Sequence, residues 1–154
     1  MSKYDKGSFQ ALVDSGRIRY QAYPAGNIAI AADAAWDELW AAAAGPIVDY
    51  WICGFQWSVA TAFAKQNHSQ LIDFGWGGAD GAAVAAANVV VTNFPVTITS
   101  VALALGPMYI GVTNLPYPVW AQAGSRAAAR IAANLVAGVA FTEFRLICAT
   151  AIGS

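Results

Sequence analysis

The stretch IVDYWICGFQWSVA, residues Ile47–Ala60, decides the fold. Apolar side chains recur at every second position, as they do along a half-buried β-strand. One face would carry five of them: Trp51, Cys53, Phe55, Trp57 and Val59. The other face is less apolar, with Asp49, Gln56 and Ser58, although Tyr50 and Ile52 interrupt it. We therefore predict a strand over this stretch.

Shorter stretches of the same kind follow at roughly ten-residue spacing, separated by glycine and proline. The candidate strands are Asn27–Ala31, Gln70–Phe74, Ala83–Val91, Val96–Leu105, Tyr109–Thr113, Val119–Gln122, Arg126–Ala133 and Ala140–Thr150. Short strands with such turns indicate a mainly β chain, a single β-sandwich or jelly roll over residues 26–154.

One segment favours a short helix or turn instead. Ala31–Ala44 is rich in alanine, with Asp33 as a candidate N-cap and Gly45 after its end. In a helix, its larger apolar side chains would form one stripe. They are Trp36, Leu39, Trp40 and Ala43.

Residues 1–25 differ from the rest of the chain and are predicted to be an extended N-terminal arm. They interleave four cations with four aromatic side chains: Lys3, Tyr4, Lys6, Phe9, Arg17, Arg19, Tyr20 and Tyr23. Such an arm would dock on a partner, because arginine and tyrosine are frequent interface hot spots. The alternative is a frayed terminus with one edge strand.

The composition points to a surface that is covered by partners. The 154 residues, 16.1 kDa, are 58% hydrophobic and include only 17 charged residues, where an average chain of this length has roughly 38. A folded monomer of this mass exposes about 7,400 Å², or on the order of 430 Å² per charge. Disorder is excluded by the hydrophobicity, and a strongly basic nucleic-acid binder by the net charge of −1. We expect a homo-oligomer.

A membrane location is not expected. The uncharged stretch between Asp80 and Arg126 is interrupted by proline, asparagine and threonine, so it offers no apolar window of about 20 residues. Residues Met1–Gln10 lack the apolar core of a secretory signal, which predicts synthesis in the cytoplasm. In that compartment Cys53 and Cys148 should be free thiols.

No catalytic, metal or cofactor site is predicted. His68 stands alone in a polar run that resembles a hairpin tip, and the two cysteines are far apart in sequence. The glycine cluster Gly75–Gly81 lacks the lysine of a phosphate-binding loop and is predicted to be a flexible hairpin. Asp73 and Asp80 have no base near them in sequence.

The stretch Gly124–Ala133, GSRAAARIAA, is the second unusual feature. In a strand, Arg126, Ala128 and Arg130 would project to one face, and Ala127, Ala129 and Ile131 to the other. The small residues would let another surface approach closely, and the arginines would offer bidentate donors to its carboxylates or carbonyls. Arg126 and Arg130 are therefore candidate interface residues, against the alternative of a strand with two solvated arginines.

Tyr50–Gly54 and Gly124–Ile131 together resemble two strands of tailed-phage β-sandwich proteins, in particular capsid decoration (cement) proteins and head-fibre bases. The resemblance covers about residues 45–150. It implies a non-enzymatic virion protein that forms a homotrimer on the capsid surface, with the major capsid protein as its partner. The alternative is a glycan- or receptor-binding module, since some of the six tryptophans could be exposed. A cupin-like enzyme is disfavoured by the single histidine.

Overall fold

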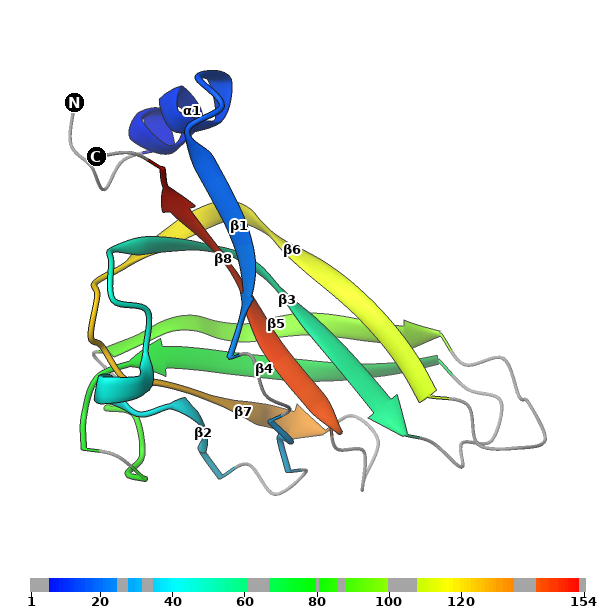
Figure 1. Cartoon of the computed structure of the whole chain (residues 1–154). Helices are drawn as coiled ribbons and strands as arrows, with labels where there is room; N and C mark the ends of the chain where they lie inside the picture. Colours follow the sequence, from blue (N-terminus) through cyan, green and yellow to red (C-terminus); the bar gives the residue numbers. More distant parts are fainter. Residues whose placement is uncertain are drawn as a thin grey trace.

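The computed structural model describes residues 6–24, 28–31, 35–60, 67–79, 81–85, 88–99, 108–134 and 141–152. Eight strands and one α-helix lie in these ranges (Figure 1). They are α1 (Lys6–Asp14), β1 (Ile18–Tyr23), β2 (Asp37–Trp40), β3 (Tyr50–Ala60), β4 (Asn67–Trp76), β5 (Val89–Thr99), β6 (Met108–Ala121), β7 (Ala127–Asn134) and β8 (Glu143–Ala151).

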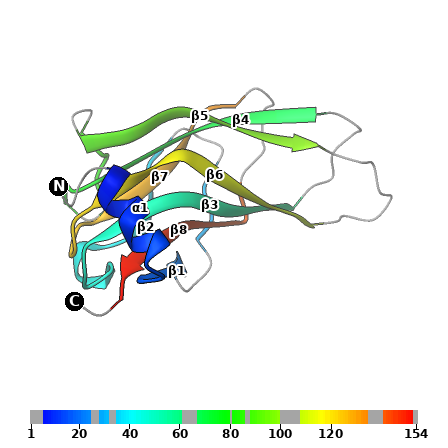
Figure 2. The same cartoon turned by 90° about the horizontal axis from the view of Figure 1, so that it is seen from above.

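The strands form two four-stranded antiparallel sheets, with the orders β1-β8-β3-β6 and β2-β7-β4-β5. In Figure 1, α1 lies at the top, next to the upper ends of β1 and β8, and β4, β5 and β7 lie below; Figure 2 looks down on α1, which is drawn in front of the strands. The predicted mainly β sandwich is confirmed. The chain passes from sheet to sheet after nearly every strand, which is the strand order of a jelly roll.

The central strand β3 changes its buried face halfway along. Tyr50 and Ile52 belong to the core at its start, whereas Phe55, Trp57 and Val59 belong to it further on. Both neighbouring strands shift register between Ile52 and Gly54, so a β-bulge there reverses the alternation. The prediction that Trp51 and Cys53 share the face of Phe55 is therefore wrong.

Glycine is required at the bulge because β6 lies against its backbone. A Cβ on Gly54 would collide with the carbonyl oxygen of Thr113 and lie 3.0 Å from Cα of Asn114. We expect Gly54→Ala to lower the free energy of unfolding by about 1–3 kcal/mol, since rigid backbone must move. Urea denaturation measures this loss. Cys53→Ala, one residue earlier, is the control, and an equal loss in both variants would contradict this explanation.

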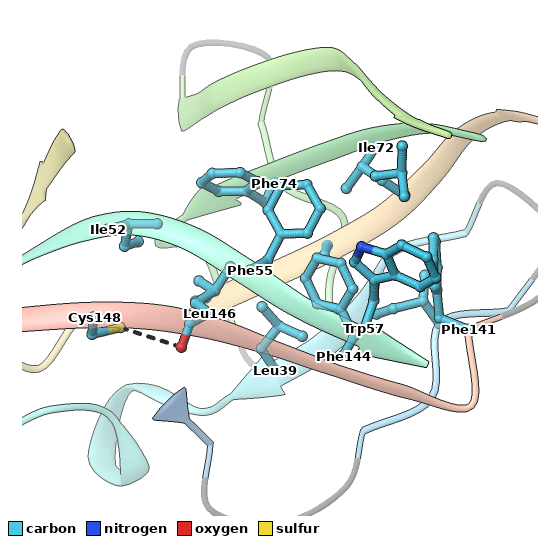
Figure 3. Packing of buried hydrophobic residues seen from close by; sticks show 14 of the residues in the cluster. Leu39, Ile52, Phe55, Trp57, Ile72, Phe74, Phe141, Phe144, Leu146 and Cys148 are labelled. Atoms are coloured by element: carbon cyan, nitrogen blue, oxygen red, sulfur yellow. Dashed lines mark hydrogen bonds between the residues drawn. The ribbon is translucent and has the colours of Figure 1, made fainter. Parts of the chain in front are cut away.

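The core lies between the sheets and is rich in aromatic rings (Figure 3). The ring of Phe55 packs against Phe144 of its own sheet, at 5.2 Å between centroids, and against Phe74 and Phe94 of the other sheet. Ala127, Ala129 and Ile131 of β7 also face the core, as their alternation predicted. Burial of these side chains holds the two sheets together.

A short helix or turn was predicted over Ala31–Ala44; in the described part of this segment the helix is wrong, and a turn is found only at Ala42–Ala44. Asp37–Trp40 form β2, and Ala42–Ala44 form a short 3-10 turn; Asp33 lies outside the described residues. Pairing with β7 buries Leu39 and Trp40, and this tertiary gain outweighs the helix preference of the alanines. The one α-helix of the described residues is α1, in the segment predicted to be an arm.

Several predicted strand boundaries are corrected. Residues 83–85 precede β5, which begins at Val89, and the two candidates at Tyr109–Thr113 and Val119–Gln122 are one strand, β6. Pro116 and Pro118 are tolerated within β6 because it is an edge strand, where one row of N–H groups has no partner. His68 lies within β4 rather than at a hairpin tip. Ile30 forms a single bridge with Phe141.

The described part of the N-terminal segment is not an extended arm. Its strand β1 pairs with β8 along its whole length, from Ile18 opposite Ala151 to Tyr23 opposite Leu146. The alternative of an edge strand is correct here, because these backbone groups complete the first sheet. The predicted division between an arm at residues 1–25 and a sandwich at residues 26–154 would therefore separate β1 from the sheet to which it belongs.

Candidate functional site

Two of the aromatic residues predicted to contact a partner pack within the chain instead. The Phe9 ring meets Trp51 edge-on at 5.7 Å, so α1 covers part of the outer face of the first sheet. Tyr23 packs on Trp40 at 5.1 Å, and its hydroxyl donates to the carbonyl of Ala44 at 2.7 Å. Both rings are thus used to attach the N-terminal segment to the sandwich.

The other predicted residues of this segment remain candidates. Arg17, Arg19 and Tyr20 are exposed on or beside β1. The Arg17 Nε donates to the carbonyl of Ile152 at 3.3 Å. Lys6 is the first residue of α1, while Lys3 and Tyr4 lie outside the described residues.

Arg126 is not an interface residue, contrary to the prediction. Only 1% of it is exposed, because the loop after β4 folds over it. Its Nε lies 3.0 Å from Oε2 of Glu38, while Nη1 and Nη2 donate to the carbonyls of Gly77 and Ala82. The guanidinium therefore ties β2 and this loop to the start of β7.

The glycine cluster predicted to be a flexible hairpin supplies this covering loop. Gly77, Gly78 and Gly81 have φ of +72°, +80° and +72°, a left-handed conformation that glycine adopts without strain. The Gly81 N–H donates to Oε2 of Glu38 at 2.7 Å. This hydrogen bond is the main reason that the pKa of Glu38 is lowered, and Arg126 adds to it.

Arg130 lies on the same outer face, within β7 and four residues after Arg126, and is partly open to solvent. Its Nε and Nη2 lie 2.9 and 2.8 Å from Oδ2 of Asp73 in β4. The other carboxylate oxygen, Oδ1, accepts the N–H of Asn93, whose φ is +51°. The guanidinium is also 4.7 Å above the ring of Trp36. Arg130 is therefore held from two sides.

These side chains surround an open hollow of about 360 Å³, which is the candidate functional site. Arg130 and Asp73 form its polar part, and the other lining residues come from the segments around them. They are Trp36, Val84, Val89 and Thr92. Ligand pockets combine apolar walls with a few convergent polar groups. In this hollow, three of the lining residues are apolar and three are polar or charged.

The titratable groups outside the hollow offer little chemistry. Cys53 and Cys148 are free thiols, as predicted, and burial raises their pKa to about 11 and about 12, which leaves them protonated at neutral pH.

Among the described residues, no three His, Cys, Asp or Glu side chains gather as metal ligands. In the same part of the chain, no helix has the length and apolarity to cross a membrane.

Three residues of this face do not stand out in the sequence. Trp36 fits a helical stripe, Asp73 has no base near it along the chain, and Glu38 belongs to the same alanine-rich segment as Trp36. Arg130 and Asp73 are 57 positions apart, and Arg126 and Glu38 are 88 apart. A carboxylate in a strand of otherwise apolar residues, as in LIDFGW, was the available signal for Asp73.

Comparisons of the chain with protein-family models, with curated proteins and with solved structures find no match.

Proposed function

We propose that this chain is a non-enzymatic structural protein of a virion surface, which self-associates and binds the outside of a capsid lattice. Jelly rolls are a common architecture of viral capsid domains, although they also occur in lectins and cupins. The fold alone does not choose among these roles. The surface of the sandwich favours the structural one.

The observation that supports it most is the distribution of exposed apolar side chains. Of the seven large ones among the described residues, six belong to the β1-β8-β3-β6 sheet or to segments next to its strands. They are Tyr20, Ile47, Val48, Val112, Tyr117 and Ile152, and only Val90 lies on the other sheet. In this proposal, the sheet that exposes most of these side chains is the interaction surface.

The apolar sheet also carries charges, since Arg19 of β1 and Arg17 beside it are exposed and β8 contains Glu143 and Arg145. On the opposite sheet, Arg126 is paired with Glu38 and Arg130 with Asp73. In this proposal the exposed apolar side chains of the first sheet contact neighbouring copies and the lattice. At about 25 cal/mol per Å², burying roughly 1,500 Å² per contact offsets the cost of association. Such contacts let a trimer bridge neighbouring copies of a major capsid protein without catalysis.

Val112→Glu tests this proposal, because 59% of Val112 is exposed on edge strand β6 of the apolar sheet. We expect the unchanged 16.1 kDa chain to run as a trimer in size-exclusion chromatography with light scattering. A buried glutamate at the contact should weaken the assembly at least about thirtyfold, because a desolvated carboxylate costs more than 2 kcal/mol. Co-sedimentation with capsids of the virion proposed to carry this chain should fall in parallel.

Val90→Glu is the matched control, since Val90 is 41% exposed but lies on the other sheet. It should leave both the mass of the assembly and capsid binding unchanged. A monomeric wild-type chain at micromolar concentration would overturn the proposal. So would a Val90→Glu variant that dissociates as completely as Val112→Glu.

A further inference from the structure

The hollow above Arg130 presents fixed hydrogen-bond donors next to a flat aromatic ring. Asp73 occupies Nε and Nη2 of Arg130, so the N–H groups on Nη1 are left to face a ligand. The indole of Trp36 holds the guanidinium from the other side, 4.7 Å away. A donor group that is already oriented loses little entropy when it binds.

The rest of the lining fits a small ligand with both polar and apolar surface. Thr92 brings a hydroxyl, which donates and accepts, while Val84 and Val89 bring apolar walls. A volume of about 360 Å³ is near the lower end of small-molecule pockets. One or two six-membered rings would fill it.

The charge of the site favours a neutral ligand. Asp73 is almost fully buried and already compensates Arg130, and the lining holds no other charged group. An anion would give up its hydration to meet a guanidinium that is already paired, beside a carboxylate that repels it. A ligand with many hydroxyl groups and no net charge avoids this cost.

We infer that the hollow binds one pyranose ring of a neutral sugar. The hydroxyls of the ring accept from Arg130 and exchange hydrogen bonds with Thr92, and its C–H face packs on the exposed part of the Trp36 indole. On a virion surface, the site would attach the particle to a glycan. Only the attachment of a virion to a glycan rests on the proposed function. Sugar binding itself does not, because the hollow lies on the other sheet from the apolar side chains.

Saturation-transfer NMR with methyl glycosides of glucose, galactose, mannose and N-acetylglucosamine tests the inference. At least one should bind with a dissociation constant on the order of 1 mM, which is typical of a single small contact. Trp36→Ala should weaken that binding about tenfold, which is the scale of one aromatic contact. Thr92→Val, which keeps the shape of the side chain, should also weaken it and decides the question if Trp36→Ala does not fold.

Trp120→Phe is the matched control, because Trp120 lies on β6 of the other sheet. It should leave sugar binding unchanged. Methyl glucuronide, the anionic counterpart of methyl glucoside, should bind more weakly than the glucoside. The inference is overturned if no neutral glycoside binds, if the glucuronide binds more tightly, or if binding survives unchanged in Trp36→Ala and Thr92→Val.

These variants distinguish a failure of the proposed virion role from a failure of the proposed sugar site. Trp36→Ala should keep the trimer and its capsid binding, whereas Val112→Glu should keep the sugar signal. Loss of the trimer alone would refute the structural role and leave the sugar site standing, and the reverse result would do the opposite.

Discussion

Replacing Phe55 with alanine is expected to lower the free energy of unfolding by about 3–5 kcal/mol. The ring is fully buried and joins the two sheets, because it stacks on Phe144 of β8 and meets Phe74 of β4 and Phe94 of β5 edge-on. Alanine would remove these contacts and leave a cavity that β-strands on both sides cannot close. Urea denaturation followed by tryptophan fluorescence measures the loss.

Phe9→Ala is the matched control for this prediction. Within the described ranges Phe9 has one ring contact, with Trp51, and it lies in α1 outside the sandwich. We expect it to cost about 1 kcal/mol. A Phe55→Ala variant that loses no more than the Phe9→Ala variant would show that this aromatic cluster does not hold the sheets together.

The sequence predicted the fold class because strand alternation and turn residues are local signals. The alternation around Phe55, Trp57 and Val59 is correct, and so is that of Ala127–Ile131. The error at Trp51 and Cys53 came from the bulge at Gly54, which depends on how β6 and β8 pair with β3. A glycine inside a strand is the local sign of such a bulge.

The error over Ala31–Ala44 has a related cause. Alanine favours a helix when nothing else decides, but in this protein small side chains also let strands and loops lie close together. Ala128, fully buried on the outer face of β7, is opposite Glu38 of β2. The helix propensity of single residues takes no account of a partner strand, so it could not predict β2.

The candidate site was predictable only in part. Arg126 and Arg130 stand out by their spacing, and the prediction that they share a face is correct, since Ala127, Ala129 and Ile131 face the core on the other side. Which of the two would be buried could not be predicted, because it depends on a glycine-rich loop that begins about fifty residues earlier. The same loop contributes Val84 to the hollow. It therefore both buries Arg126 and forms part of the wall beside Arg130.

Replacing Arg126 with methionine is expected to lower the free energy of unfolding by about 3 kcal/mol. Removing one partner of a buried ion pair commonly costs about 3–5 kcal/mol, and the lower value applies because 31% of the Glu38 side chain is exposed and can be hydrated. Methionine retains most of the apolar stem, so the loss would come from Glu38 and from the carbonyls of Gly77 and Ala82. Arg19→Met, on exposed β1, is the control and should change stability by no more than about 0.5 kcal/mol.

The pH dependence of this loss separates the ion pair from simple packing. The pKa of Glu38 is lowered in the folded state, chiefly by the Gly81 N–H and further by Arg126, from an ordinary value of 4.5. A lowered carboxyl pKa stabilises the folded state above the unfolded pKa, and this stabilisation disappears as the pH falls through the folded pKa. The difference between wild type and Arg126→Met should therefore be largest at neutral pH and narrow below about pH 4.5. It should not vanish, because the hydrogen bonds from Arg126 to Gly77 and Ala82 do not depend on Glu38. A difference that stays constant across this range would mean that Arg126 acts through these carbonyls alone.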